Sequence, residues 1–341
     1  MKAKRIISGL CVAAMLVGLY GCGGTAKVTV TNVDENELPE SEIKTGTYHP
    51  GVSLHDPQVW VEGEGEYWMY GTHMTQASGT SLSDWTKFAD GVRPNSPIYS
   101  NLFDKEEGED HPDAFKFVGK NTDRGYSVWA PSVIYNEVMG KYMMYFCTTS
   151  TYIKSNICYA VSDNPEGPYE YVDTILYSGF VKSDIDKTDF YEVMGEDVDL
   201  KKYVAANNFN NTDWPNCIDP ALLYDKDGRL WMVYGSWSGG IFLIEIDQET
   251  GDVIHPEEDP ENNVDHYYGK RLVGGGHHAI EGPYIEADFD NGYYYLFVSY
   301  GNLQANGGYQ IRQYRSDKID GDYVDITGST PWNQDDFSDY G

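Results

Sequence analysis

The stretch that decides the fold is residues 216–241, Asn216-Cys-Ile-Asp-Pro-Ala-Leu-Leu-Tyr-Asp-Lys-Asp-Gly-Arg-Leu-Trp-Met-Val-Tyr-Gly-Ser-Trp-Ser-Gly-Gly-Ile241. An aspartate and a proline precede a short apolar run, and a Lys-Asp-Gly turn follows it. A second run, rich in aromatic residues, then ends in small residues. Two apolar runs joined by a glycine-containing turn predict a β-hairpin. Proline suits the head of its first strand, because a missing N–H costs least there.

The same pattern occurs three more times along the chain. The other copies begin His55-Asp56-Pro57, Trp129-Ala-Pro131 and Ile280-Glu281-Gly-Pro283, and each continues into a turn and an aromatic-rich run. Further strand-like runs follow the hairpins, and helical periodicity is almost absent. Repeated units of about four short strands predict the blades of an all-β propeller.

Four such repeats are visible, and no closing strand pattern precedes the end of the sequence at Gly341. We therefore expect a propeller that lacks its last blade. A four-bladed ring is the alternative.

The N-terminus carries the pattern of a bacterial lipoprotein signal peptide over residues 1–22. A basic start is followed by an apolar run at 6–20, which is short for a membrane span. The sequence Leu19-Tyr20-Gly21-Cys22 resembles a lipobox, which predicts lipidation of Cys22. We expect residues 23–47 to form a flexible acidic tether and residues 48–341 the propeller domain. The protein is then exported and held at the membrane only through its lipid; an ordinary cleaved signal peptide is the alternative.

Charge and cysteine content narrow the classes of partner. A formal net charge of −30 argues against nucleic acid, anionic lipid and polyanionic substrates, and favours a neutral partner. Aromatic residues make up 14% of the chain, including 29 tyrosines, which fits stacking on sugars but also an all-β core. Cys147, Cys158 and Cys217 are predicted to be small buried residues rather than a disulfide framework. A Cys147–Cys158 bridge is the alternative.

Three acids stand at the heads of first strands, namely Asp56, Asp219 and Glu281, in repeats one, three and four. In a propeller these strand heads converge at one face, so the three carboxylates meet there and repel one another. At least one pKa should therefore rise, as a division between a general acid and a general base requires. An aspartate before proline is alternatively a turn former, but three acids at matching positions favour catalysis. Repeat two, with Ser132 after Pro131, offers no acid.

The ordered motifs resemble glycoside hydrolase family 43. They are His55-Asp56-Pro57, Trp129-Ala130-Pro131, Ile218-Asp219-Pro220, Gly235-Ser-Trp-Ser-Gly-Gly-Ile241 and Ala279-Ile-Glu281-Gly-Pro283. Within that family they look most like the endo-α-1,5-L-arabinanases, which are five-bladed β-propellers. The resemblance runs from Tyr48 to Asp325.

The resemblance implies a function for each acid. Asp56 is expected to be the general base and Glu281 the general acid, while Asp219 raises the pKa of Glu281 and orients it. The family inverts configuration, which places the two reacting carboxyl groups about 6.5–9.5 Å apart.

Two departures from the family pattern concern Ser132 and a metal. Many relatives have aspartate at the position of Ser132, so a substrate contact there is expected to differ. The resemblance also implies Ca²⁺ in the central channel near a histidine of the fifth blade, and that blade is not in this sequence.

Several further residues are candidates for substrate binding. Trp129 is expected to stack under a furanose ring, whereas Trp237 and Tyr152 either line neighbouring subsites or pack in the core. His55 and Asn216 flank the acids and are expected to hydrogen-bond to them. The adjacent pair His277-His278 precedes Glu281 and is not expected to hold a metal, because neighbours on a strand face opposite sides.

The leading hypothesis is a monomeric, inverting endo-arabinanase that acts on a neutral plant polysaccharide, the arabinan side chains of pectin. An exo-acting α-L-arabinofuranosidase or β-xylosidase of the same family is the near alternative. A non-catalytic lipoprotein that captures glycans is the alternative from another class.

Overall fold

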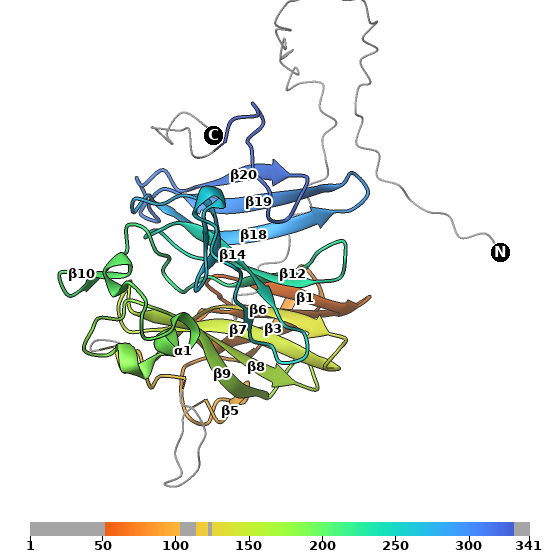
Figure 1. The fold of residues 1–341 in the computed structure, drawn as a ribbon. Coiled ribbons are helices and arrows are strands. Elements are labelled where there is room, and N and C mark those ends of the chain that lie inside the picture. Colours follow the sequence, from red (N-terminus) through yellow and green to blue (C-terminus); the bar gives the residue numbers. More distant parts are fainter. Residues whose placement is uncertain (1–51, 103–113, 122–124, 331–341) are drawn as a thin grey trace, which may run out of the picture. The chain divides into compact units, whose positions relative to one another are not determined.

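In the residues that the computed structural model describes, four large β-sheets, one for each sequence repeat, and a separate two-stranded sheet make up the fold (Figure 1). The model describes residues 52–102, 114–121 and 125–330. These residues belong to a unit that spans 47–341, separate from residues 1–46. The predicted signal peptide, Cys22 and the tether therefore lie outside the described residues.

Blades 1 and 2 follow each other in the sequence. Blade 1 is a sheet of β1 (Gln58–Gly63), β2 (Glu66–Gly71), β3 (Thr75–Ser81) and β4 (Asp84–Ala89), paired in that order. Blade 2 contains β6 (Ser127–Asn136), β7 (Lys141–Thr149), β8 (Ser155–Ser162) and β9 (Tyr169–Ser178), with β5 (Tyr99–Ser100) added in parallel to β9. The other neighbouring pairs in both sheets are antiparallel.

Blades 3 and 4 complete the described propeller. Blade 3 contains β12 (Ala221–Tyr224), β13 (Leu230–Tyr234), β14 (Ile241–Ile246), β17 (Gly269–Val273) and β16 (Val264–Asp265), with β15 (Val253–Ile254) paired to β14. Blade 4 contains β18 (Ile280–Asp288), β19 (Tyr293–Tyr300) and β20 (Gln310–Ser316). The four sheets confirm the all-β, propeller-like prediction for the described residues, whereas the fifth blade stays a prediction.

The segment between blades 2 and 3 holds most of the short helical turns. It contains η3 (Ile185–Lys187), α1 (Phe190–Met194), η4 (Leu200–Lys202) and the small hairpin of β10 (Val204–Ala205) and β11 (Asn208–Phe209). Two further turns are η2 (Thr72–Met74) and η5 (Pro260–Asn262). In the part of the chain that the structure describes, no helix is long and apolar enough to cross a membrane.

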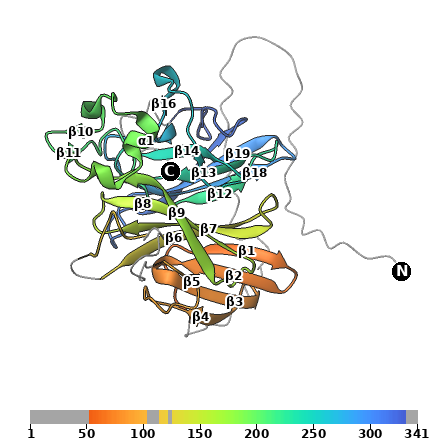
Figure 2. The ribbon, with the colours of Figure 1, turned by 60° about the horizontal axis from the view of Figure 1, so that its bottom comes forward.

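The first strands of the blades lie side by side in chain order, β1 beside β6, β6 beside β12 and β12 beside β18 (Figure 2). Hydrogen bonds link neighbouring first strands. Gln58 of β1 exchanges two bonds with the Val133 backbone, and the Leu222 N–H of β12 donates to Ser132 Oγ over 3.2 Å. Ser132 is buried, and its hydroxyl joins blades 2 and 3.

Burial follows the sequence pattern of each blade. Strands β7 and β8 are buried on both faces along nearly their whole length, because blade 2 packs between blades 1 and 3. Strand β19 alternates between buried and half-buried residues, as expected for a sheet with one face on the core.

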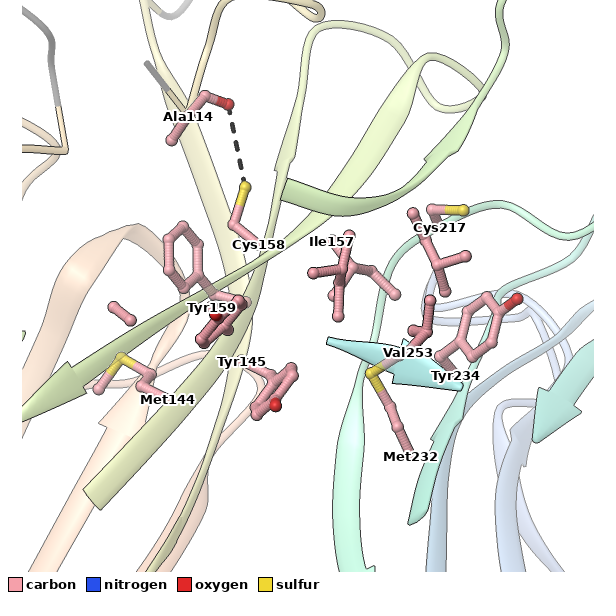
Figure 3. Close-up of a cluster of buried hydrophobic side chains, with 14 of the residues drawn as sticks. Ala114, Met144, Tyr145, Ile157, Cys158, Tyr159, Cys217, Met232, Tyr234 and Val253 are labelled. Atoms are coloured by element: carbon pink, nitrogen blue, oxygen red, sulfur yellow. Dashed lines mark hydrogen bonds between the residues drawn. The ribbon is translucent and has the colours of Figure 1, made fainter. Parts of the chain in front are cut away.

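The three cysteines within the described residues are free thiols, each fully buried. Figure 3 shows Cys158 and Cys217 within a cluster of buried hydrophobic side chains, with the Cys158 thiol directed at the carbonyl oxygen of Ala114. The prediction of small buried residues is confirmed, and no Cys147–Cys158 bridge is formed.

Candidate active site

The residue before each repeat proline has a left-handed backbone in all four blades. Its φ angle is 53° at Asp56, 43° at Ala130, 55° at Asp219 and 58° at Gly282. Such angles are uncommon for residues other than glycine and cost free energy that the surrounding structure must supply. The four strand heads therefore share one left-handed geometry, which turns the chain into the first strand and is strained at the three residues other than Gly282.

Glu281 does not occupy the same position as the two aspartates. In the β18–β19 ladder Glu281 pairs with Ser299 just before a bulge, as Trp129 pairs with Cys147 just before the bulge in blade 2. Glu281 is thus equivalent to Trp129, and Gly282 takes the place of Asp56 and Asp219. The prediction of three matching positions is wrong for Glu281, because an additional residue separates it from its proline. In blade 2 the position of the aspartates is held by Ala130, not Ser132.

Asp219 interacts electrostatically with both of the other acids. Its side chain is half-buried, and its Oδ2 accepts a hydrogen bond from the Gly282 N–H over 3.1 Å. Burial, and then the charges of Asp56 and Glu281, raise the pKa of Asp219 to about 8, against the effect of that hydrogen bond. Acids at the strand heads of blades 1 and 4 therefore both act on the carboxyl group of blade 3, and one pKa rises as the sequence predicts.

Glu281 is held by three hydrogen-bond donors. The Tyr309 hydroxyl donates to Oε1 over 2.8 Å, while Trp237 Nε1 and the Ser236 hydroxyl donate to Oε2 over 2.9 and 3.3 Å. Burial and the interaction with Glu281 raise the pKa of the Tyr309 phenol to about 12, so it donates at neutral pH. Donors on both oxygens fix the plane of the carboxyl group.

The loop that carries Trp237 is bent tightly onto blade 4. Trp237 and Ser238 have left-handed φ angles of 49° and 40°, and the Trp237 N–H donates to the Ile280 carbonyl over 2.7 Å. Gly239 is required in this loop, since a Cβ there would lie 2.4 Å from the Asp213 carbonyl oxygen. The Gly-Ser-Trp-Ser-Gly-Gly motif therefore places two donors against the acid of the next blade.

Asp56 is fixed by donors from its own blade. The Thr72 hydroxyl donates to Oδ2, and His55 Nδ1 lies 2.7 Å from Oδ1. Thr72 also accepts a hydrogen bond from the Ala130 N–H over 3.0 Å, which ties this acid to blade 2. The predicted contact of His55 with an acid is present, and about a third of the Asp56 side chain, 37%, remains exposed.

Trp129 and Tyr152 lie next to each other on blade 2, with ring centroids 6.4 Å apart and planes inclined at 50°. Tyr152 is 80% exposed, so it is not a core residue. Asn216 was expected to hydrogen-bond to the acids, but its side chain has other partners. It is buried, donates to the Tyr152 carbonyl and accepts from the Ser178 hydroxyl over 3.4 Å, and thus supports the Tyr152 loop.

The rings of the adjacent residues His277 and His278 have different neighbours. The His277 ring lies 5.6 Å from Trp237, and His278 Nδ1 lies 2.5 Å from the Gly275 carbonyl oxygen. No group of three or more His, Cys, Asp or Glu side chains in the described ranges is arranged to hold a metal. Calcium in the central channel therefore stays a prediction.

Sequence reasoning missed three residues that contact the acids. Thr72 and Ser236 both follow the second strand of their hairpins, and both lie in stretches whose repetition was recognised. Tyr309 stands after the glycine-rich loop 301–308, and nothing in its surroundings marks it as a partner of Glu281.

Comparisons with known proteins agree with this geometry. Residues 196–339 match the model of glycosyl hydrolases family 43. The extracellular endo-alpha-(1->5)-L-arabinanase 2 of Bacillus subtilis (strain 168) is 35% identical over 294 residues, which cover 86% of this chain and 54% of the relative. The extracellular endo-alpha-(1->5)-L-arabinanase of Thermotoga petrophila is 37% identical over 281 residues, 82% of this chain and 52% of the relative.

A solved structure shows the same similarity in three dimensions. The endo-1,5-alpha-L-arabinanase of Thermotoga petrophila RKU-1 superimposes with a TM-score of 0.66 at 36% identity, over 84% of this chain and 56% of the other. The chain spans about half the length of the curated relatives it matches. By its sequence, its blades and the order of its motifs, the chain is similar to members of glycosyl hydrolases family 43.

Proposed function

We propose that this protein hydrolyses α-1,5-L-arabinofuranosyl linkages within arabinan, with inversion of configuration. The observation that carries the proposal is the position of Asp219, where burial, and then the charges of Asp56 and Glu281 from two other blades, raise its pKa to about 8. A site with several interacting carboxyl groups suits general acid and base catalysis of glycoside cleavage. The substrate follows from the two relatives that are named endo-arabinanases.

In the proposed reaction Asp56 is the general base. It takes a proton from a water molecule, whose oxygen then attacks the anomeric carbon of the sugar as the glycosidic bond breaks. Thr72 and His55 hold the Asp56 carboxylate in one orientation, and its partial exposure leaves room for water.

Glu281 is the proposed general acid, which gives its proton to the departing glycosidic oxygen. The donors Tyr309, Trp237 and Ser236 orient the carboxyl group for this transfer. Because the pKa of Asp219 is about 8, Asp219 is protonated at neutral pH, and the three carboxyl groups together carry at most two negative charges. Trp129 and Tyr152 lie on blade 2, and we propose that their rings contact furanose units of the bound chain.

Product analysis tests this proposal. The full chain is incubated with debranched linear arabinan, and the products are sized while proton NMR follows the anomeric configuration of the first sugar released. Short oligomers with inverted configuration support the proposal, and arabinose alone would indicate the exo-acting alternative. A folded sample that binds arabinan and releases nothing would instead support a glycan-binding lipoprotein.

We also propose that the protein is exported and anchored through a lipid on Cys22, and that it acts as a monomer. Both relatives are named extracellular, which supports export. Labelling of the full chain with a fatty-acid analogue in a bacterial host tests the anchor, with Cys22→Ser as the control that should lose the label. Light scattering tests the monomer.

A further inference from the structure

A hollow lies at the end of the first strands that is opposite to the acids. It is a cavity of about 770 Å³ lined by residues of blades 1 to 3, and its lining residues are Trp60, Glu62, Tyr135, Glu137, Gly140, Tyr142, Asp163, Tyr224, Gly228 and Gln248. In blade 2, Ala130 marks the strand head at which the other blades carry their acids, and Tyr135 on the same strand lines the cavity. Five residues separate them, a distance of roughly 16 Å at the rise of an extended strand. The cavity is therefore separate from the catalytic mouth.

Aromatic rings from three blades form much of this cavity. Trp60 and Tyr135 both stand edge-to-face against Tyr142, with ring centroids 5.9 and 5.0 Å away. The Tyr224 hydroxyl donates to the Tyr135 carbonyl over 3.1 Å, which fixes the fourth ring. Trp60, Tyr135 and Tyr224 are half-buried rather than enclosed, so part of each side chain remains accessible. Rings held in this way can stack on a sugar without losing conformational freedom.

The polar lining favours a neutral ligand with hydroxyl groups. Three carboxylates exclude an anion, and the residues that line the cavity include no Lys or Arg. Two of the carboxylates already have partners, since Glu62 accepts from Trp60 Nε1 over 2.7 Å and Asp163 pairs with Lys141 at 2.5 Å. Glu137 is exposed at the rim. Asp163 is paired with a lysine and Glu62 holds a neutral donor, and the remaining acceptor positions of these carboxylates suit the hydroxyl donors of a sugar.

We infer that this cavity is a second binding site, for a neutral pentose oligosaccharide. Its volume falls within the range of about 300–1,000 Å³ that is common for small-molecule sites. The kind of sugar rests on the proposed function, because a site for the polymer being cut would hold the chain near the catalytic mouth and raise its effective concentration. The binding itself depends only on the rings and acceptors of the cavity.

Calorimetric titration of the full chain with linear α-1,5-arabino-oligosaccharides tests the inference. The titration uses Glu281→Gln, which prevents turnover. We expect about two sites per chain, and the addition of Trp60→Ala should weaken one of them about tenfold, as for the loss of one stacking ring. Thermal unfolding of each variant shows whether it is folded.

Glu137→Ala gives a second route if Trp60→Ala does not fold, because Glu137 is exposed at the rim. We expect it to weaken the same site about threefold, the effect of one hydrogen bond to a sugar. Val138→Ala is the matched control, since Val138 is the exposed neighbour and does not line the cavity. It should change nothing.

The outcomes separate this inference from the proposed function. Wild-type protein that cuts no arabinan but shows oligosaccharide binding sensitive to Trp60→Ala or Glu137→Ala refutes the activity and supports the cavity. A single site that neither substitution affects overturns the second site, whatever the activity. Spermidine binding that depends on Trp60 or Glu137, with no such oligosaccharide binding, would also overturn it and assign the cavity to an organic cation.

Discussion

Asp219 of blade 3 and Glu281 of blade 4 stand at the heads of adjacent first strands, yet their surroundings differ. Asp219 is the left-handed residue before its proline, and one backbone N–H is the hydrogen-bond donor recorded for its carboxyl group. Glu281 stands one residue earlier, within the strand, and three side-chain donors approach both of its oxygens.

The difference shows how one residue of register separates two functions. At the left-handed position of blade 3, the short side chain of Asp219 is held where burial and two other acids favour its protonated state. On the strand, the longer glutamate reaches donors from the loop after β13 and from Tyr309. Asp219, which favours its protonated state, and Glu281, which is oriented by donors, thus lie in neighbouring blades built from the same sequence repeat.

Glu281→Gln should produce the largest effect if the oriented carboxyl group is the acid. The amide cannot give up a proton to the leaving sugar, so we expect arabinan hydrolysis to fall about 10²–10⁴-fold. Reducing-sugar release from debranched arabinan measures the loss.

Glu286→Gln is the matched control for this substitution. Glu286 lies on the same strand and is exposed, and it accepts a hydrogen bond from Tyr284. The activity of the Glu286→Gln variant should therefore equal that of the wild type. Wild-type activity in Glu281→Gln would show that Glu281 is not the general acid, and that its donors do not distinguish its function from that of Asp219.

Asp219→Asn should change both activity and the pH dependence of stability. We expect hydrolysis to fall about a hundredfold, at the low end for a group that assists proton transfer. The carboxyl pKa is about 8 in the folded protein and about 3.9 in an unfolded chain. The folded state therefore binds more protons between these values, and the free energy of unfolding decreases as pH rises from about 4 to about 8.

Thermal unfolding at a series of pH values checks this direction. The wild type should lose stability across that range, and Asp219→Asn should lose less, because asparagine does not titrate. Parallel curves for the two proteins would show that Asp219 is not the proton-holding member of the group.

Much of the site was predictable from the sequence, because the acids and prolines repeat in a fixed order. The exact place of Glu281 was not, because the position of a bulge depends on how β18 pairs with β19. Tyr309 is brought to Glu281 by the return of β20 alongside β19, a contact that no spacing reveals. Asn216 shows the opposite error: closeness to Asp219 in sequence suggested a contact, whereas its side chain is turned toward Tyr152 and Ser178.

Tyr309→Phe tests the donors that distinguish Glu281 from Asp219. Loss of one hydrogen bond to a partly exposed carboxylate should lower kcat about tenfold. Tyr284→Phe is the control, because the Tyr284 hydroxyl donates to Glu286. An equal fall in kcat for Tyr309→Phe and Tyr284→Phe would show that the hydrogen bond to Glu281 is not the cause.

The left-handed position itself gives the smallest and most specific test. Gly282→Ala should lower the free energy of unfolding by about 1 kcal/mol, the cost of a left-handed backbone for a residue with a Cβ. The nearest atom to the added Cβ would be Ser299 Oγ at 3.5 Å, an ordinary contact, so sterics should add little. Ala130 holds the equivalent position in blade 2 with a φ of 43°, and Ala130→Gly should relieve that strain there. Denaturant unfolding of both variants compares the blades directly, and a cost from Ala130→Gly as large as that from Gly282→Ala would show that side-chain packing, rather than backbone strain, decides stability at these strand heads.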